Sequence, residues 1–415
     1  MLKWRYWLMQ LRTRLWIKPA LTGLVAVGWI EMAYIASSWQ MKPPFEIDRD
    51  VVLSLLQILA STMLTVAIFA VTAMVSAFSA VTTTATPRAS RLIMQDRSSQ
   101  NALAAFLSAF IYAIVALVAV SAIPYGTLGR FFLFVGYVLI IAWVLVSFIR
   151  WVDQVSNLGR VSDTIRRVEA ACQEAFTDPA TAGTLGARPA PADAPETGLL
   201  LTTQKIGYLQ FVDVEALQDA AHEWQATIRL LVRPGAFLDR CRPLASVIGP
   251  ASLVLDDEKK ERLLKAFTLG EERQAESDPR FGLVMLAEIA DRALSPGIND
   301  PGTAIAVIGS QVRLLCRWAD ATRDEEEVKF PAVEVPPLLA ADLLDDAFTP
   351  IARDGAAMYE VGTRLQKAFL ALQTTHHTEL ATAARHHSRL ALEQALAKLP
   401  TQYHRDKLQA MAVQA

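Results

Sequence analysis

Four apolar stretches in the first 150 residues limit what this chain can fold into. They cover roughly residues 20–39, 51–80, 102–124 and 131–149. A helix of about 20 apolar residues is long enough to cross the hydrocarbon core of a bilayer. Helices also satisfy their backbone hydrogen bonds internally, as a lipid environment requires. We therefore predict a membrane α-helical fold with four transmembrane helices over residues 19–150.

Lysine and arginine are distributed unevenly around these stretches. Five precede the first, three lie between the second and third, and four follow the fourth within residues 150–167. The two other loops hold only Lys42, Arg49 and Arg130. Because cytoplasmic loops are enriched in basic residues, we expect a multi-pass protein of the bacterial inner membrane with both termini in the cytoplasm. Residues 1–18 alternate basic and apolar side chains at helical spacing, which predicts an interfacial helix on the bilayer.

Two polar features stand out within the apolar stretches. Glu31 is a carboxylate inside the first, where it is either functional or close enough to the outer interface to reach polar surroundings. A stripe of hydroxyl side chains marks one face of the second at 100° per residue: Ser54, Ser61, Thr65, Thr72, Ser76, Ser79 and Thr83. Small hydroxyl residues pack membrane helices closely, and they also line aqueous pores. Both interpretations of this stripe stay open.

The rest of the chain predicts a cytoplasmic α+β region, a small α/β unit followed by a helical bundle. We expect a membrane-proximal helix over residues 151–177, a flexible Ala/Pro/Gly-rich linker over 178–200 and the α/β unit over 201–256. Residues 257–415 form the helical domain in this interpretation. It begins with a helix that ends at Gly270, continues with helices over 279–294 and 301–321, and has two or three more after residue 338. The acidic stretch 323–337 is expected to be a surface loop.

Residues 293–304, ALSPGINDPGTA, lie between two of these helical patterns. Asp300 is placed as an N-cap with Pro301 at the first helical position, and the Ser295-Pro296 pair ends the preceding helix. A structural corner accounts for every special residue. The alternative is a ligand or subunit contact at Asn299, Asp300, Gly302 and Thr303, with either a cation held by Asp300 and Asn299 or an anion held by the helix N-terminus. Arg233, beside the Pro234-Gly235 turn, is a second candidate anion contact.

Composition and motifs exclude several classes of function. The net charge of −2 argues against a nucleic-acid partner. The three cysteines show no metal-ligand spacing, and we expect all three to be buried and unreactive. No Gly-rich phosphate loop, nucleophile elbow or zinc-protease motif is present. His376 and His387 would lie about 16 Å apart on one helix, too far to share a metal ion. We predict no catalytic residues, no metal and no cofactor.

The stretch ALSPGINDPGTA resembles the hallmark of a bacterial membrane family, domain of unknown function 2254. The similarity extends over nearly the whole chain, including TPRASRLIMQDRSSQNALAAF, IGYLQFVDVEAL, LLVRPGAFLDRCRPLASV and DPRFGLVMLAEIADRAL. The sequence departs from the family at Gly297, where alanine is usual, and in PGAFLDRC, where the family commonly has an acid and a second glycine. The resemblance implies a membrane protein and carries no activity with it.

Two functions remain after these exclusions. The first is an oligomeric ion channel or transport protein, in which the hydroxyl stripe of several copies lines a path across the membrane. The second is a non-conducting sensor or scaffold, anchored by its membrane helices and binding a partner or small ligand through its cytoplasmic domain. The expected partners are the lipid bilayer, further copies of this chain and an ion or small-molecule ligand.

Overall fold

The computed structural model describes residues 17–39, 41–84, 86–89, 97–157, 160–178, 181, 183–191, 198–321 and 328–413. The chain divides into two compact units. We call residues 1–84 and 90–163 the membrane unit, and residues 85–89 and 164–415 the second unit. Residues 1–16 of the predicted interfacial helix lie outside the described residues.

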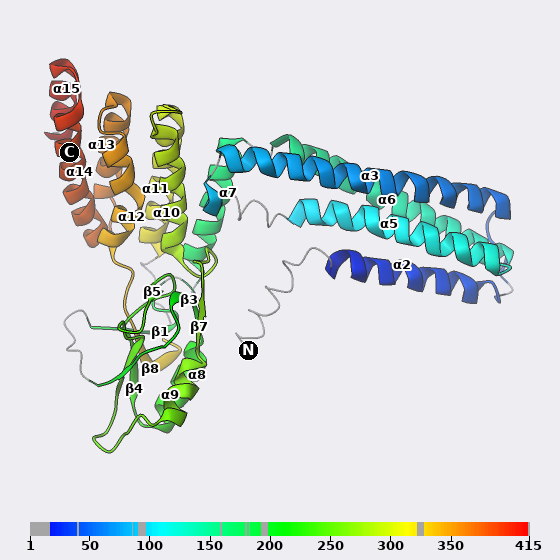
Figure 1. The fold of residues 1–415 in the computed structure, drawn as a ribbon, viewed down its shortest axis with the longest axis horizontal. Coiled ribbons are helices and arrows are strands. Elements are labelled where there is room, and N and C mark those ends of the chain that lie inside the picture. Colours follow the sequence, from blue (N-terminus) through cyan, green and yellow to red (C-terminus); the bar gives the residue numbers. More distant parts are fainter. Residues whose placement is uncertain are drawn as a thin grey trace. The chain divides into compact units, whose positions relative to one another are not determined.

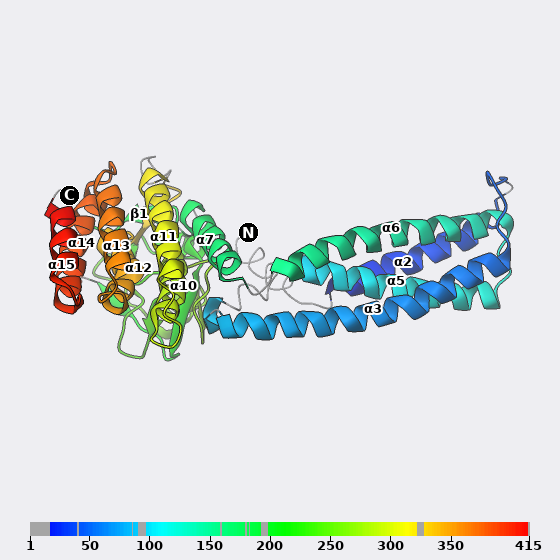
Figure 2. The ribbon, with the colours of Figure 1, turned by 90° about the horizontal axis from the view of Figure 1, so that it is seen from above.

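The described residues of the membrane unit form four helices: α2 (Ile17–Ala36), α3 (Arg49–Thr84), α5 (Arg97–Ala122) and α6 (Thr127–Asn157) (Figures 1 and 2). Among the described residues, α3, α5 and α6 are long and apolar enough to cross a membrane, whereas the apolar part of α2, Ala20–Ala36, is shorter. Seventeen residues fall just below the length that a straight spanning helix needs. Three candidate spans are therefore established, and the fourth stays a prediction.

Helix α5 is the central helix of this unit and packs against α2, α3 and α6. Alanines on its buried faces, such as Ala105, Ala109 and Ala113, let the neighbouring helices approach closely. Buried polar groups are paired with backbone: the hydroxyl of Tyr112 donates to the carbonyl of Leu133 over 2.6 Å. The core of the membrane unit is thus made by α5 and the faces that α2, α3 and α6 turn toward it.

Helix α3 extends beyond the expected apolar stretch at both ends. Its 36 residues would measure about 54 Å at 1.5 Å per residue, well over the thickness of the hydrocarbon core. The predicted continuation of the fourth span into one membrane-proximal helix is not seen. Instead α6 ends at Asn157, and a separate helix, α7, spans Val161–Thr177.

The second unit contains two small sheets. The larger has the order β1-β8-β4-β6-β2, with β1 and β4 parallel to β8 and the remaining pairs antiparallel. Its strands are β1 (Ala187–Pro189), β2 (Leu199–Leu201), β4 (Thr227–Leu230), β6 (Ala245–Ile248) and β8 (Phe330–Val335). The smaller, antiparallel sheet has β3 (Gly207–Val212) between β5 (Phe237–Leu238) and β7 (Phe267–Gly270). With α8 (Val214–Glu223) and α9 (Asp257–Leu264), the strands enclose one apolar core.

Besides β2, two of whose three residues lie in the expected linker, three strands occur where the sequence did not predict them. Strand β1 lies inside the expected linker, and β8 lies inside the expected surface loop. They pair with each other, and β8 also pairs with β4, so their order depends on partners distant in sequence. The helix expected to end at Gly270 ends at Leu264, and its remaining residues form β7 on the edge of β3. Tertiary pairing overrides local pattern in all three cases.

Six helices complete the second unit: α10 (Pro279–Leu294), α11 (Pro301–Ala321), α12 (Ala340–Asp354), α13 (Tyr359–Gln373), α14 (Thr378–Lys398) and α15 (Gln402–Val413). Helices α10 and α11 occupy the ranges that the sequence predicts. Four helices follow β8 instead of the two or three expected. In the views of Figures 1 and 2 these six helices and α7 stand beside one another in a row.

A short segment that follows α3 in sequence belongs to the second unit. In residues 86–89, Thr86 and Ala89 are buried. The guanidinium of Arg88 forms an ion pair with Glu288 on α10. Residue 85 alone separates this docked segment from the end of α3 at Thr84.

Candidate functional site

The hydroxyl stripe of α3 lies on the surface of the membrane unit. The side chains of its first six members, Ser54, Ser61, Thr65, Thr72, Ser76 and Ser79, are all exposed, whereas the side chain of Thr83 lies outside the described residues. The buried residues of α3, such as Leu56, Leu59 and Met63, face α5. At 100° per residue the two sets lie roughly 180° apart. The stripe is therefore the face of α3 that one chain leaves uncovered.

Most of the exposed hydroxyl groups in this stripe donate to the backbone of α3 itself. Ser61 donates to the carbonyl of Ile58 (3.1 Å), Thr65 to Ser61 (3.1 Å), Thr72 to Ile68 (3.0 Å) and Ser79 to Val75 (3.0 Å). A hydroxyl that bonds to the carbonyl three or four residues earlier is compatible with an apolar environment, because its hydrogen is satisfied. The stripe can accordingly face lipid, a second helix or water.

Glu31 does not join the stripe. Helix α2 packs mainly against α5 and α6, and Glu31 itself is exposed. Burial raises the pKa of the Tyr125 phenol in the α5–α6 connection, and the neighbouring charges of Glu31 and Tyr34 add to the shift. The ring of Tyr34 packs edge-on against Tyr125 at 6.0 Å. Glu31 thus has polar groups of a connecting loop nearby, as its interfacial interpretation requires.

The corner between α10 and α11 is built as the sequence suggests. Helix α10 ends at Leu294 with Ser295 in an extended conformation as its C-cap. Asn299 adopts a positive φ of 52°, a conformation that asparagine tolerates better than most residues. Asp300 caps α11 through the backbone N–H of Thr303 (3.1 Å) and also accepts the Thr303 hydroxyl (2.7 Å).

The tip of this corner is open to its surroundings. Residues 296–300 are all exposed, including an apolar side chain, Ile298, at 50%. Gly302 is exposed as well. The hydrogen bonds from Thr303 lower the pKa of the Asp300 carboxyl, so this acid is charged at neutral pH. The local contacts assign the corner a structural role, and a ligand or subunit contact there stays a prediction.

Arg233 connects three segments of the second unit. Its guanidinium donates to the carbonyls of Gly183 (2.6 Å), Pro336 (2.7 Å) and Thr181 (3.2 Å). These carbonyls precede β1 and follow β8, which are neighbours in the larger sheet. The contacts give Arg233 the role of a cross-link between loops, and an anion there would have to compete with them.

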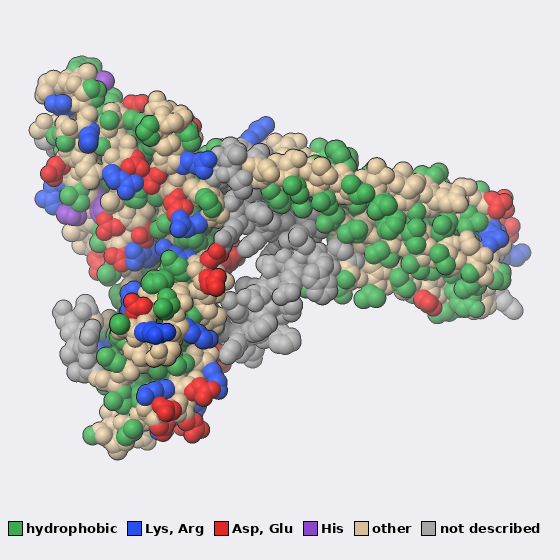
Figure 3. Space-filling view, viewed as in Figure 1, with side chains coloured by type: hydrophobic (Ala, Val, Ile, Leu, Met, Phe, Trp, Pro, Cys, Tyr) green, Lys and Arg blue, Asp and Glu red, His purple; other side chains and the backbone are tan. Residues whose placement is uncertain are grey.

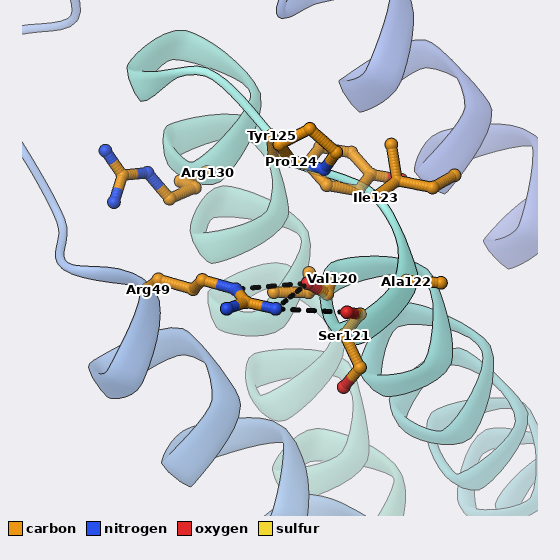
Figure 4. A pocket seen from close by; sticks show the side chains of 8 residues that line it. All are labelled: Arg49, Val120, Ser121, Ala122, Ile123, Pro124, Tyr125 and Arg130. Carbon is orange, nitrogen blue, oxygen red and sulfur yellow. Dashed lines mark hydrogen bonds between the residues drawn. The ribbon is translucent and has the colours of Figure 1, made fainter.

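The membrane unit contains a polar pocket that the sequence did not predict. A cavity of about 270 Å³ is lined by eight residues from the start of α3, the end of α5, the α5–α6 connection and the first turn of α6. They are Arg49, Val120, Ser121, Ala122, Ile123, Pro124, Tyr125 and Arg130 (Figure 4). Arg49 and Arg130 are the arginines of the two loops that are otherwise poor in basic residues. Their isolation in these two loops was the sequence signal that could have pointed to the pocket.

Histidine and cysteine form no metal centre in the part of the chain that the structure describes, where no three His, Cys, Asp or Glu side chains group to hold an ion. His376 precedes α14, so it does not share that helix with His387. The expectation that all cysteines are buried is wrong for Cys241, which is exposed. Cys241 lies in an irregular segment after β5, and the side chains of this segment pack little against the core.

The fold and these sites define a class of protein. The chain is an integral membrane protein with a unit of long apolar helices and a second unit of two small sheets and a row of helices. It belongs to the family described as "Predicted membrane protein (DUF2254)", whose sequence model matches residues 12–371.

Relatives of this chain occur in mycobacteria. Uncharacterized proteins of Mycobacterium bovis and Mycobacterium tuberculosis are 35% identical to it over 125 residues. The matched segment covers 28% of this chain and 23% of each relative, so the similarity spans about a quarter of their length. No solved structure matches the chain.

Proposed function

We propose that this protein is a homo-oligomeric channel or transport protein of the bacterial inner membrane, with α3 of several copies surrounding the path. The observation that supports the proposal is the exposure of all six described stripe side chains on a helix long enough to cross the bilayer. Small hydroxyl residues suit a water-filled path or close packing against a neighbouring helix.

The geometry of a single chain motivates the oligomer. The stripe points away from α5, the helix on which α3 packs, so α2, α5 and α6 leave it uncovered. Other exposed residues of α3 are large and apolar, among them Leu64, Ile68 and Phe69. In this proposal the apolar residues contact neighbouring subunits or lipid, and the stripe faces the axis. The basic residues of the flanks support a cytoplasmic location for both termini.

A non-conducting sensor or scaffold is the second candidate, and one observation favours it. Small hydroxyl residues on an exposed face also suit dry, close packing of two membrane helices. In that case α3 would hold copies together, and the exposed corner around Ile298 would contact a partner through the second unit. No enzymatic step enters either proposal.

Ion flux through purified protein in liposomes tests the channel. We expect wild-type protein to conduct, and Thr72→Trp to reduce flux by about tenfold or more by placing an indole on the axis. Val71→Trp is the matched control, because Val71 is exposed at the same depth but about 100° around the helix. Flux that both variants reduce equally would show a general defect and contradict a path along the stripe.

The oligomeric state in detergent supplies an independent check. A monomer by light scattering, under conditions in which the protein stays folded, would contradict a path shared between subunits. An oligomer with no flux across several salts and pH values would favour the scaffold. An oligomer that conducts, and whose flux responds only to Thr72→Trp, would support the channel.

A further inference from the structure

We propose that the pocket between Arg49 and Arg130 binds a phosphate-type oxyanion. The pocket lies at the end of the membrane unit that carries the α5–α6 connection, distant in sequence from most of the stripe. On the face drawn in Figure 3, charged side chains gather at this end, and the long flank of the unit is mostly hydrophobic. The site includes Arg49, the first residue of α3, but the evidence for it does not depend on the hydroxyl stripe.

Arg49 is held in place by the C-terminal turn of α5. Its Nε and Nη2 atoms both donate to the carbonyl of Val120 (3.2 and 2.8 Å), and Nη2 also donates to Ser121 (3.1 Å). These carbonyls belong to the last turn of a helix, where backbone acceptors lack partners within the helix. The contacts fix the guanidinium at the wall of the pocket (Figure 4). Its Nη1 donates to none of the described residues.

Arg130 lies across the pocket in the first turn of α6. Its Nε atom is buried and has no hydrogen-bond partner among the described residues. A buried N–H left without an acceptor destabilises a protein, so an acceptor in the pocket would be stabilising. The N-terminus of α6 adds a partial positive charge at the same place.

The residues that line this pocket carry a net positive charge. No acidic residue is among the eight that line it. Neither arginine forms an ion pair with a carboxylate in the ranges that the structure describes. Arg49 has its Nη1 group left to donate and Arg130 has its Nε, so an oxyanion in the shared cavity can accept from both guanidinium groups.

A phosphate group in this pocket has two sources, a lipid headgroup and the free anion. The volume of about 270 Å³ is enough for a phosphate group. Val120, Ile123 and Pro124 add apolar side chains to the lining. Arginines at the ends of spanning helices commonly meet lipid headgroups. The ligand is therefore the phosphate of an anionic phospholipid or free inorganic phosphate, and binding measurements separate the two.

The test uses the full-length protein and three variants. Arg130→Gln removes one guanidinium, and Ser121→Glu places a carboxylate at an exposed lining position where it competes for both arginines. Lys42→Gln is the control, because Lys42 is an exposed basic residue of the α2–α3 connection that does not line the pocket. Binding of radiolabelled inorganic phosphate is measured in a neutral detergent. Retention of dioleoylphosphatidylglycerol is measured by mass spectrometry after the protein has been exchanged into the same detergent.

We expect wild type and Lys42→Gln to bind one of these probes saturably, and Arg130→Gln and Ser121→Glu to bind it about tenfold or more weakly. Loss of phosphate binding identifies a free anion, and loss of phospholipid retention identifies a headgroup. If one variant does not fold, the other still decides the result. Equal binding by all four proteins, or no saturable binding of either probe to wild type, would overturn the proposal whatever the flux experiment shows.

Discussion

Gly235 packs directly on the carboxylate of Asp278. Gly235 has a φ of +94°, and a Cβ atom built on it would overlap the Asp278 side chain. Asp278 is buried, caps α10 through the N–H of Phe281 (3.3 Å) and accepts from Nε of Arg273 (2.7 Å). The turn after β4 is therefore fitted against the start of the helix that leads to the exposed corner.

This contact predicts a large difference between two glycine substitutions. Gly235→Ala should destabilise the second unit by about 2–4 kcal/mol, through left-handed strain and displacement of a buried carboxylate. Gly297→Ala should change stability by less than about 0.5 kcal/mol, because nothing lies within 4 Å of its Cβ position. Thermal unfolding of the two variants measures the difference, and similar melting temperatures would contradict the prediction.

The pH dependence of stability should carry a contribution from Asp291 on α10. Burial raises the pKa of its carboxyl to about 7, with Asp354 adding to the shift and Arg353 opposing it. Because the folded state holds this proton more tightly than the unfolded state, the contribution is complete below about pH 4 and is lost as pH rises through 7. Relative to Asp291→Asn, wild type should lose about 2 kcal/mol across this range after allowance for solvent screening.

Denaturation at a series of pH values checks this sign. The variant keeps a neutral side chain at every pH, so the difference in unfolding free energy between the two proteins isolates the carboxyl. A difference that stays constant from pH 4 to pH 8, or that grows in favour of wild type as pH rises, would contradict the assignment.

The three native cysteines should react with a maleimide at different rates. Cys241 is exposed and should be modified first. Cys172 lies beneath Gly282 on α10, and burial raises the pKa of its thiol, so both access and thiolate formation are suppressed. Mass spectrometry of the native protein should therefore show Cys241 labelled at times when Cys172 is unmodified. Rapid labelling of Cys172 would show that α7 separates from α10.

Cysteines introduced in the stripe distinguish a wet face from a dry one. In a Cys241→Ser background, Thr65→Cys and Thr72→Cys should react with a charged, water-soluble thiol reagent if α3 borders a path. Met63→Cys, on the buried face of α3, should stay protected and serves as the control. Protection of both stripe positions in a membrane-embedded oligomer would support dry packing and contradict the channel.

Local sequence signals were sufficient for much of the helical structure. Helices α10 and α11 begin and end where proline, capping residues and the apolar period place them. The stripe of α3 was visible because hydroxyl spacing is a property of one helix. The same reasoning could not find β1 or β8, because the two strands pair with each other and β8 also pairs with β4.

The candidate sites likewise divide into those that neighbouring residues predict and those that depend on segments distant in sequence. Asp300 could be assigned as a cap from its neighbours alone. The pocket could not be predicted, because Arg49 and Arg130 are 81 positions apart by their residue numbers and are brought together only by the packing of α3 and α6 around α5. The role of Arg233 likewise depends on carbonyls from segments distant in sequence.

The hydroxyl hydrogens of Ser61, Thr65 and Thr72 are all directed into the backbone of α3. A hydroxyl group has one hydrogen to give and two lone pairs that can receive. Outwardly, these side chains therefore offer electron-rich oxygen and no donor. Whatever lies against α3 in the membrane, whether a hydrated cation, a water column or a neighbouring chain, has to bring the hydrogen or the positive charge itself.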